Sequence, residues 1–61
     1  MATNLMTIGN DIASLWGASC LEAQIDADAK RVVFVCIEHG ELFAAPMSFD
    51  DIKSEYGYDV M

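Results

Sequence analysis

Apolar side chains recur at steps of three and four residues in the first part of the chain. The residues in this series are Leu5, Ile8, Ile12, Leu15 and Trp16. Such spacing places them on one stripe of an amphipathic helix, for which Thr3 or Thr7 is a suitable N-terminal cap. Gly17 is a natural stop for this helix, whereas Gly9 costs about 1 kcal/mol relative to alanine and allows a later start near Asn10.

The pattern changes to a period of two after the predicted helix. Leu21, Ala23 and Ile25 alternate with polar residues, which is typical of a half-buried strand. Residues 26–30 are polar and predict a turn. Residues 32–37 then form a run of β-branched and aromatic residues that is apolar on both sides, as expected for the central strand of a sheet.

A hairpin turn and a third strand follow the central strand. His39 and Gly40 predict a two-residue turn, because glycine supplies the positive φ that such turns require. Residues 42–47 would then pair back as a third strand. Pro46 cannot donate a ladder hydrogen bond, so this strand belongs at an edge of the sheet.

The residues after this strand predict a short second helix. Ser48 is a suitable N-terminal cap, and Asp50 and Asp51 would lie at the positive end of the helix dipole. The side chains expected to face the core are Phe49, Ile52 and Tyr56. Gly57 would end the helix and leave residues 58–61 as a tail that is either disordered or folded against the body.

Together these elements predict an α+β fold in which residues 1–61 form a single domain. A three-stranded antiparallel meander would lie between an N-terminal and a C-terminal helix, in the order helix, strand, strand, strand, helix. The central strand is apolar on both faces and needs cover on both. Either the two helices divide between the faces, or one face meets a second copy of the chain.

Composition narrows the classes of function. Hydrophobic residues make up 54% of the chain, more than the roughly 45 to 50% typical of globular proteins, so the chain can fold despite a net charge of -7. Ten acidic residues against three basic ones disfavour direct binding of nucleic acid and attract cationic protein surfaces, although negative charge can also serve solubility alone. The first residues contain no secretory signal pattern, and the longest apolar run is too short for a membrane span, so we expect a cytoplasmic protein.

The residues that could carry catalytic chemistry are few. His39 is the only histidine, and Cys36 is the nearest nucleophile along the chain. A Cys-His pair needs a third group that orients the base and a site for the oxyanion, which so small a fold offers little room to build. We therefore expect no enzyme and no catalytic residue. Cys20 and Cys36 would lie on adjacent strands, opposite or within one residue of each other, where a disulfide is conceivable but two buried thiols are favoured.

The sequence also lacks complete motifs for binding a metal or a cofactor. Two cysteines and one histidine do not complete a zinc site, and the paired C-x-x-C spacing is missing. Asp26 and Asp28 begin like a calcium loop, but Arg31 stands where glycine is needed and Ile37 where glutamate is needed. The four glycines are scattered and form no phosphate-binding loop. We expect neither a metal nor a cofactor.

The acidic side chains remain as candidate contacts. The topology would gather four of them at one end of the sheet, where Lys30 and Arg31 partly offset the charge: these are Asp26, Asp28, Asp50 and Asp51. The opposite end would collect Glu38, Glu41, Glu55 and Asp59. Outward positions along a strand lie about 6.8 Å apart, roughly twice the charge spacing along one DNA strand, so carboxylates can stand in for a sparse row of phosphates.

With this compact layout, the chain resembles the small acidic anti-CRISPR proteins made by bacteriophages and mobile elements. The acidic pairs that carry the resemblance are Asp26 and Asp28, Glu38 and Glu41, and Asp50 and Asp51. The resemblance lies in overall character along the whole chain. It implies a stoichiometric inhibitor in the host bacterial cytoplasm that needs no cofactor and blocks target DNA binding by a subunit of a CRISPR effector complex. The basic groups with which that subunit reads DNA would bind the six carboxylates.

A second interpretation belongs to a different class of protein. In a homodimeric scaffold or regulatory subunit, the second apolar face of the central strand would form the interface through Val33, Val35 and Ile37. The negative charge would then confer only solubility. A monomer is favoured over a homodimer, and the sequence leaves the alternative open.

Overall fold

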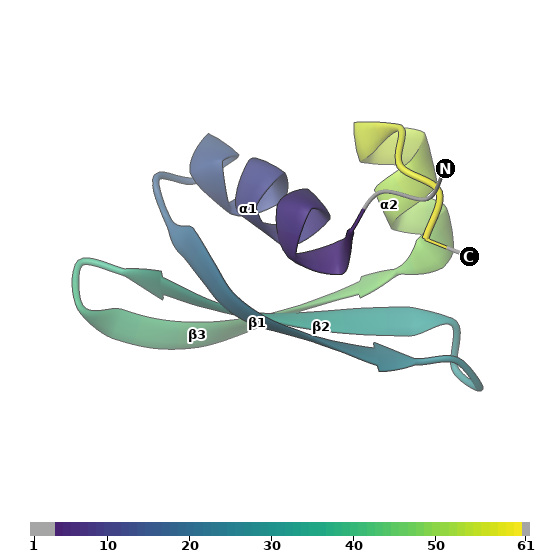
Figure 1. Cartoon of the computed structure of the whole chain (residues 1–61), viewed down its shortest axis with the longest axis horizontal. Coiled ribbons are helices and arrows are strands. Elements are labelled where there is room, and N and C mark those ends of the chain that lie inside the picture. The colour runs from purple at the N-terminus through teal and green to yellow at the C-terminus, as the bar shows by residue number, and fades with distance from the viewer. Residues whose placement is uncertain (1–3, 61) are drawn as a thin grey trace.

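The computed structural model describes residues 4–60 and confirms the predicted α+β order. The elements are α1 (Leu5–Leu15), β1 (Ser19–Asp26), β2 (Arg31–Glu38), β3 (Glu41–Ser48) and α2 (Phe49–Tyr56). The strands form one antiparallel sheet in the order β1-β2-β3, with β2 at its centre as predicted (Figure 1). Both helices lie on the same side of this sheet, so the alternative in which they divide between its two faces is wrong (Figure 1).

The core lies between the helices and one face of the sheet. Its fully buried residues are Ile8, Ile12 and Ala13 from α1, Cys20 from β1, Val32, Phe34 and Cys36 from β2, and Ile52 from α2. Three of these side chains occupy alternate positions of β2 and therefore point to the same face. Phe34 is the largest residue that is fully buried, and it stands at the middle of the central strand.

The first helix begins one residue after Asn4, whose side chain accepts a hydrogen bond from the Met6 N–H at 2.7 Å. The predicted cap at Thr7 is wrong, because Thr7 lies inside the helix, and Thr3 lies outside the described residues. Asparagine caps helices at least as well as threonine, so the earlier start satisfies the free N–H groups of the first turn. Gly17, at a φ of 75°, follows the last turn as predicted.

The buried side of α1 differs from the predicted stripe. Leu15 is 70% exposed, whereas Gly9 and Ala13 are buried. Successive helix residues turn by about 100°, so Gly9 and Ala13 lie on the opposite side of the row of isoleucines from Leu15. Gly9 and Ala13 therefore join the two isoleucines in packing on the sheet, and the expectation that Leu15 is buried is wrong.

Gly9 is the point at which α1 comes closest to the sheet. A Cβ atom at this position would lie 2.6 Å from the Cys20 Sγ and 2.8 Å from the Phe34 Cδ1. The neighbouring Asn10 fixes the same contact, because its Oδ1 accepts a hydrogen bond from the Cys20 N–H at 3.1 Å. The glycine that weakens an isolated helix thus permits the close approach of the helix backbone to β1 and β2.

A bulge interrupts the alternation of β1. Cys20 pairs with Cys36 and Glu22 pairs with Val35, so Leu21 is the extra residue on β1. After the bulge Ala23 pairs with Phe34 and shares its face, as the period of two predicts. Leu21 itself is exposed, so its predicted alignment with Ala23 is wrong.

The turns and the second helix agree with the sequence. Glu38 pairs with Glu41 across a two-residue turn in which His39 and Gly40 both have positive φ. The Ser48 hydroxyl accepts a hydrogen bond from the N–H of the third helical residue, at 3.0 Å, and so caps α2. Gly57 ends this helix in the left-handed conformation.

The tail after α2 is folded against the body. Tyr58 and Val60 pack on the core, and the Tyr58 hydroxyl donates a hydrogen bond to the Asp11 carboxylate of α1. The tail therefore links the last helix to the first. Within residues 4–60, neither helix has the length and apolar character needed to cross a membrane.

Candidate interaction surface

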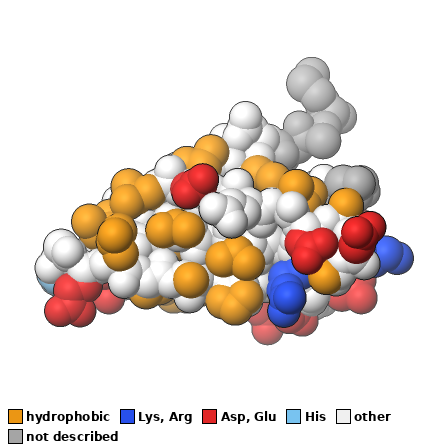
Figure 2. All heavy atoms as spheres, turned by 90° about the horizontal axis from the view of Figure 1, so that it is seen from below, with side chains coloured by type: hydrophobic (Ala, Val, Ile, Leu, Met, Phe, Trp, Pro, Cys, Tyr) orange, Lys and Arg blue, Asp and Glu red, His pale blue; other side chains and the backbone are white. Residues whose placement is uncertain are grey.

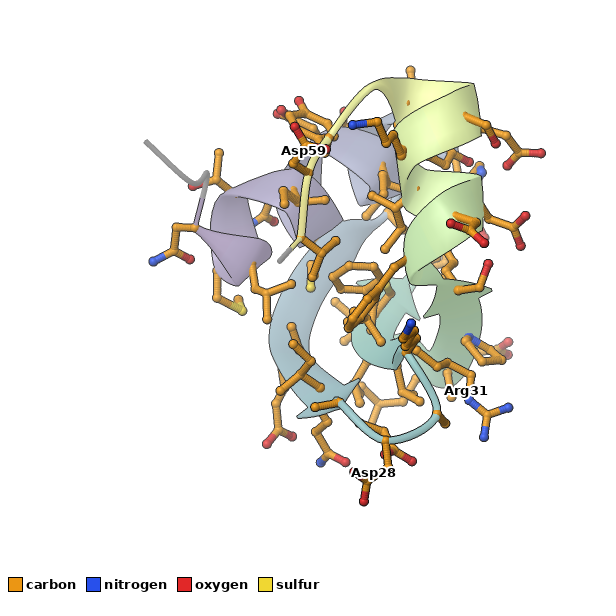
Figure 3. All side chains as sticks on the ribbon, turned by 90° about the vertical axis from the view of Figure 1, so that its right-hand side faces the viewer. Asp28, Arg31 and Asp59 are labelled. Atoms are coloured by element: carbon orange, nitrogen blue, oxygen red, sulfur yellow. The ribbon has the colours of Figure 1, made fainter. Side chains whose placement is uncertain are left out.

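One end of the sheet brings together carboxylates from two separate stretches of the chain. Arg31 at the start of β2 lies level with the ends of β1 and β3, and the Phe49 N–H donates to the Lys30 carbonyl at 2.9 Å. This contact holds the start of α2 against the turn at residues 27–30. The carboxylates at this end are Asp26, Asp28, Asp50 and Asp51, and all four are exposed. Figure 3 views the molecule from this end.

These carboxylates carry mostly unneutralised charge. Among the described residues the single ion pair joins Lys53 to Asp59, so none of the four carboxylates forms an ion pair with Lys30 or Arg31. Asp26 has a structural role, because its Oδ1 accepts a hydrogen bond from the Ala29 N–H at 3.2 Å within the turn. Charge in excess of what the fold requires therefore lies on the turn and on the first turn of α2.

The opposite end of the sheet carries Glu38 and Glu41. They are directly paired across the hairpin, and like charges in this arrangement destabilise a sheet. This end lies about 24 Å from Arg31, as seven residue steps of about 3.4 Å imply. The six predicted contact residues therefore form two separate groups, at the two ends to which the strand directions assigned them.

Asp59 lies away from the hairpin end to which the sequence assigned it. Gly57 turns the chain back along α2, so Asp59 reaches Lys53; Figure 3 shows it beside the helices, across the view from Asp28. Both side chains of this ion pair are about two-thirds exposed, at 67% and 70%. Exposed ion pairs of this kind contribute at most about 1 kcal/mol to the stability of a fold. The path of the tail, and not this ion pair, therefore determines where Asp59 lies.

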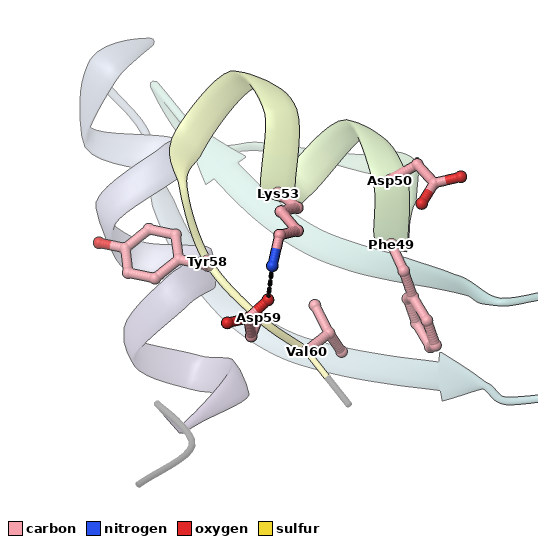
Figure 4. Close-up of a pocket in the computed structure, with 6 residues that line it drawn as sticks. All are labelled: Phe49, Asp50, Lys53, Tyr58, Asp59 and Val60. Carbon is pink, nitrogen blue, oxygen red and sulfur yellow. Dashed lines mark hydrogen bonds and ion pairs between the residues drawn. The ribbon is translucent and has the colours of Figure 1, made fainter.

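The tail and α2 enclose a small open hollow with a volume of about 270 Å³ (Figure 4). It is lined by Phe49, Asp50, Lys53, Tyr58, Asp59 and Val60. Its cation is paired with one carboxylate, and its tyrosine hydroxyl is bonded to α1. The lining therefore combines apolar side chains with one ion pair and a second carboxylate, and it holds no nucleophile beside a base.

The cysteine and the histidine considered for catalysis lie in different environments. Cys36 is fully buried beneath the helices, whereas His39 lies in the exposed hairpin turn. Burial, together with the neighbouring Cys20, raises the pKa of the Cys36 thiol and disfavours its nucleophilic thiolate. Both cysteines are free thiols. Residues 4–60 contain no group of three metal-binding side chains.

The face of the sheet without helices carries a second set of apolar side chains. Cross-strand partners share a face, and Ile37 pairs with Leu42, Val35 with Ala44, and Val33 with Pro46. These six residues are defined here as the open apolar stripe. Figure 2 shows hydrophobic side chains across the middle of this face, with acidic groups near both ends and basic groups near one.

The β1 edge of this face is polar. Glu22, Gln24 and Asp26 pair with successive open-face residues of β2 and form an acidic border beside the stripe. The sequence pattern identified the apolar second face of β2 but not the contribution of β3. The β3 signal is weak, because alanine and proline are apolar without being strand formers.

In comparisons with known proteins, no protein-family model matches the chain, and no curated protein and no solved structure is significantly similar to it. Its fold and surface define the class to which it belongs: a small acidic α+β protein with one helix-covered and one open sheet face.

Proposed function

We propose that this chain is a non-catalytic inhibitor that binds a basic, DNA-recognising surface of another protein. The protein that we propose as its partner is a subunit of a bacterial CRISPR effector complex, which the inhibitor would meet in the host cytoplasm. The observation that supports this proposal is the collection of four exposed carboxylates at one end of the sheet, drawn from two separate stretches of the chain. The acidic resemblance to anti-CRISPR proteins supplies the choice of complex.

The proposed mechanism is stoichiometric occupation. Lysine and arginine side chains that contact the phosphates of target DNA would instead bind Asp28, Asp50 and Asp51, with Asp26 beside them. Glu38 and Glu41 would serve as a second contact where the basic surface extends to the other end. A net charge of -7 accelerates encounter with such a surface and makes the association sensitive to salt. No cofactor takes part.

A DNA gel-shift assay with a purified type I effector complex tests this proposal. We expect excess wild-type protein to prevent the complex from binding its target DNA. The Asp50→Asn variant removes one charge from the proposed contact, whereas Glu55→Gln is a matched control that removes one exposed carboxylate from the last turn of α2. Target binding that persists at saturating wild-type protein would refute the proposal, and equal inhibition by both variants would refute the contact residues.

A further inference from the structure

We propose that the open face of the sheet is a docking surface for a basic protein partner. The open apolar stripe would receive an apolar ridge of the partner, and the acidic border on β1 would bind lysine or arginine side chains beside that ridge. The inference rests on the proposed function only for the statement that the partner is basic. It adds a contact that charge mimicry alone does not require.

The composition of the face distinguishes it from an ordinary solvent-exposed sheet. Antiparallel sheets with one wet face alternate apolar residues inward and polar residues outward. The strand β1 follows this rule, since its outward residues after the bulge are Glu22, Gln24 and Asp26. The strands β2 and β3 break it, because all six outward residues between Val33 and Pro46 are apolar, and Leu42 is 65% exposed. Contiguous apolar surface of this kind marks interaction sites.

The charges around the stripe specify the chemistry of the occupant. Glu22 and Asp26 lie along its β1 side, and Arg31 lies at one end as the single cation on the outward face within the described strands. A partner that places a neutral or acidic rim here would leave these carboxylates unpaired. A rim of lysine and arginine would pair with them and would also meet the carboxylates at both ends of the sheet.

A second copy of the chain fits this face poorly. Three strands about 4.8 Å apart and about 27 Å long cover roughly 400 Å², so two copies would bury about 800 Å² in total. Stable interfaces bury about 1,200 Å² or more. Both ends of the sheet are acidic, so any two-fold arrangement with aligned strands sets one acidic end against another. A basic partner avoids this repulsion and can extend its contact onto those ends.

Two short peptides test the inference independently of any CRISPR complex. The first is an amphipathic, amidated peptide of leucine and lysine, and the second is an oligolysine of the same charge; both are titrated into the ¹⁵N-labelled full chain below the concentration at which the first self-associates. We expect the leucine-containing peptide to bind about tenfold more tightly, as burial of a few side chains predicts, and to shift the amides of Val33, Val35 and Ala44 most.

Variants on the two sides of the molecule provide the matched comparison. We expect Ala44→Gln to weaken binding of the leucine-containing peptide about tenfold, because it places a polar amide in the stripe without changing the charge. Leu15→Gln, which also places a glutamine at an exposed apolar position but on α1, should leave binding unchanged. Val35→Thr provides a second stripe variant of nearly equal shape if the Ala44→Gln chain does not give a folded spectrum.

Three outcomes would overturn the inference. Equal binding of both peptides, with shifts confined to the acidic ends, would show that charge alone governs the contact. Binding of neither peptide would show that the face does not recognise this chemistry. A dimer in sedimentation equilibrium that Ala44→Gln or Val35→Thr dissociates would make a second copy the occupant. A negative gel shift together with the expected peptide result would reject the CRISPR partner and retain the docking surface.

Discussion

The two faces of the central strand β2 carry similar residues but differ in how deeply those residues are buried. Val32, Phe34 and Cys36 point toward the helices and are fully buried, whereas Val33 and Val35 point outward and are only half-buried. Valine occurs on both faces, so residue type does not distinguish them. The difference arises because both helices of this short chain pack on one side (Figure 1). Apolar residues on a strand therefore indicate that its face favours burial, but they do not identify the element that buries it.

The largest expected loss of stability comes from a substitution on the helix-covered face of β2, compared with one on its open face. We expect Phe34→Ala to lower the free energy of unfolding by about 3 to 5 kcal/mol, because it empties the centre of the core. Val35→Ala on the open face should cost clearly less, since its side chain already contacts water. Urea unfolding followed by circular dichroism measures both, and equal losses would show that the open face is as tightly packed as the core.

The second prediction concerns the contact that allows α1 to cover its face. We expect Gly9→Ala to destabilise the fold, because the new Cβ would overlap the Cys20 Sγ and the Phe34 ring at a cost of about 1 to 3 kcal/mol. The gain in helix propensity of about 1 kcal/mol offsets part of this cost and leaves a net loss of up to about 2 kcal/mol. Thr7→Ala, at an exposed position of the same helix, is the control and should be neutral or slightly stabilising. A stabilised Gly9→Ala protein would mean that α1 lies further from the sheet.

The third prediction uses pH to probe the covered face. Burial raises the pKa of the Cys36 thiol above its ordinary value of 9.0, and a hydrogen bond to Asp11 raises that of the Tyr58 hydroxyl. Below these ordinary values both states keep the protons, so the stability is fully present. Above them the unfolded chain loses protons that the folded chain retains, so we expect stability to fall as the pH rises through and beyond about 9.

Urea unfolding at neutral pH and near pH 10 measures this loss. Cys36→Ala and Tyr58→Phe should each lose stability less steeply over the same interval, because each lacks one of the two groups. An open-face variant such as Val35→Thr should retain the full dependence. A wild-type protein whose stability is constant across the interval would contradict the burial of the thiol.

The smallest effect is expected at the hairpin end. Glu38 and Glu41 oppose each other directly, so we expect Glu41→Lys to stabilise the fold by about 0.2 to 1 kcal/mol. The gain should shrink as salt is added, since it is electrostatic. Thermal unfolding at low and high ionic strength measures it. If the same change also weakens inhibition in the gel-shift assay, the pair is retained for binding at the expense of stability.

Local signals in the sequence were sufficient where an element depends on neighbouring residues. The turn at His39 and Gly40 needs one position with positive φ that glycine supplies, and the Ser48 cap needs only a hydroxyl before a helix. The gathering of Asp28 and Asp50 at one end follows from strand directions alone. These predictions are confirmed because each depends on contacts over a few residues or on topology.

The failures involve contacts between distant segments. The predicted buried stripe of the first helix was centred on its large apolar residues and so included Leu15. The close approach at Gly9 turns the side that carries Gly9 and Ala13 toward the sheet instead. Leu21 left the predicted alternation because the bulge lets Cys20 and Ala23 both face the helices. The predicted position of Asp59 at the hairpin end is wrong. The tail returns along α2 because Tyr58 and Val60 pack on the core, and this packing has no signal in the sequence. None of these contacts has a local pattern.

The sequence by itself determined the number, type and order of the elements, the central place of β2 and the excess of negative charge, because periodicity and turn chemistry act over short stretches. Only the tertiary structure decided that both helices share one face, that β3 extends the apolar second face of β2, and that Asp59 pairs with Lys53 of α2. Those features depend on which surfaces meet in space, and a helix can satisfy its apolar side equally well on either face of a sheet until the connecting segments and the close contact at Gly9 select one.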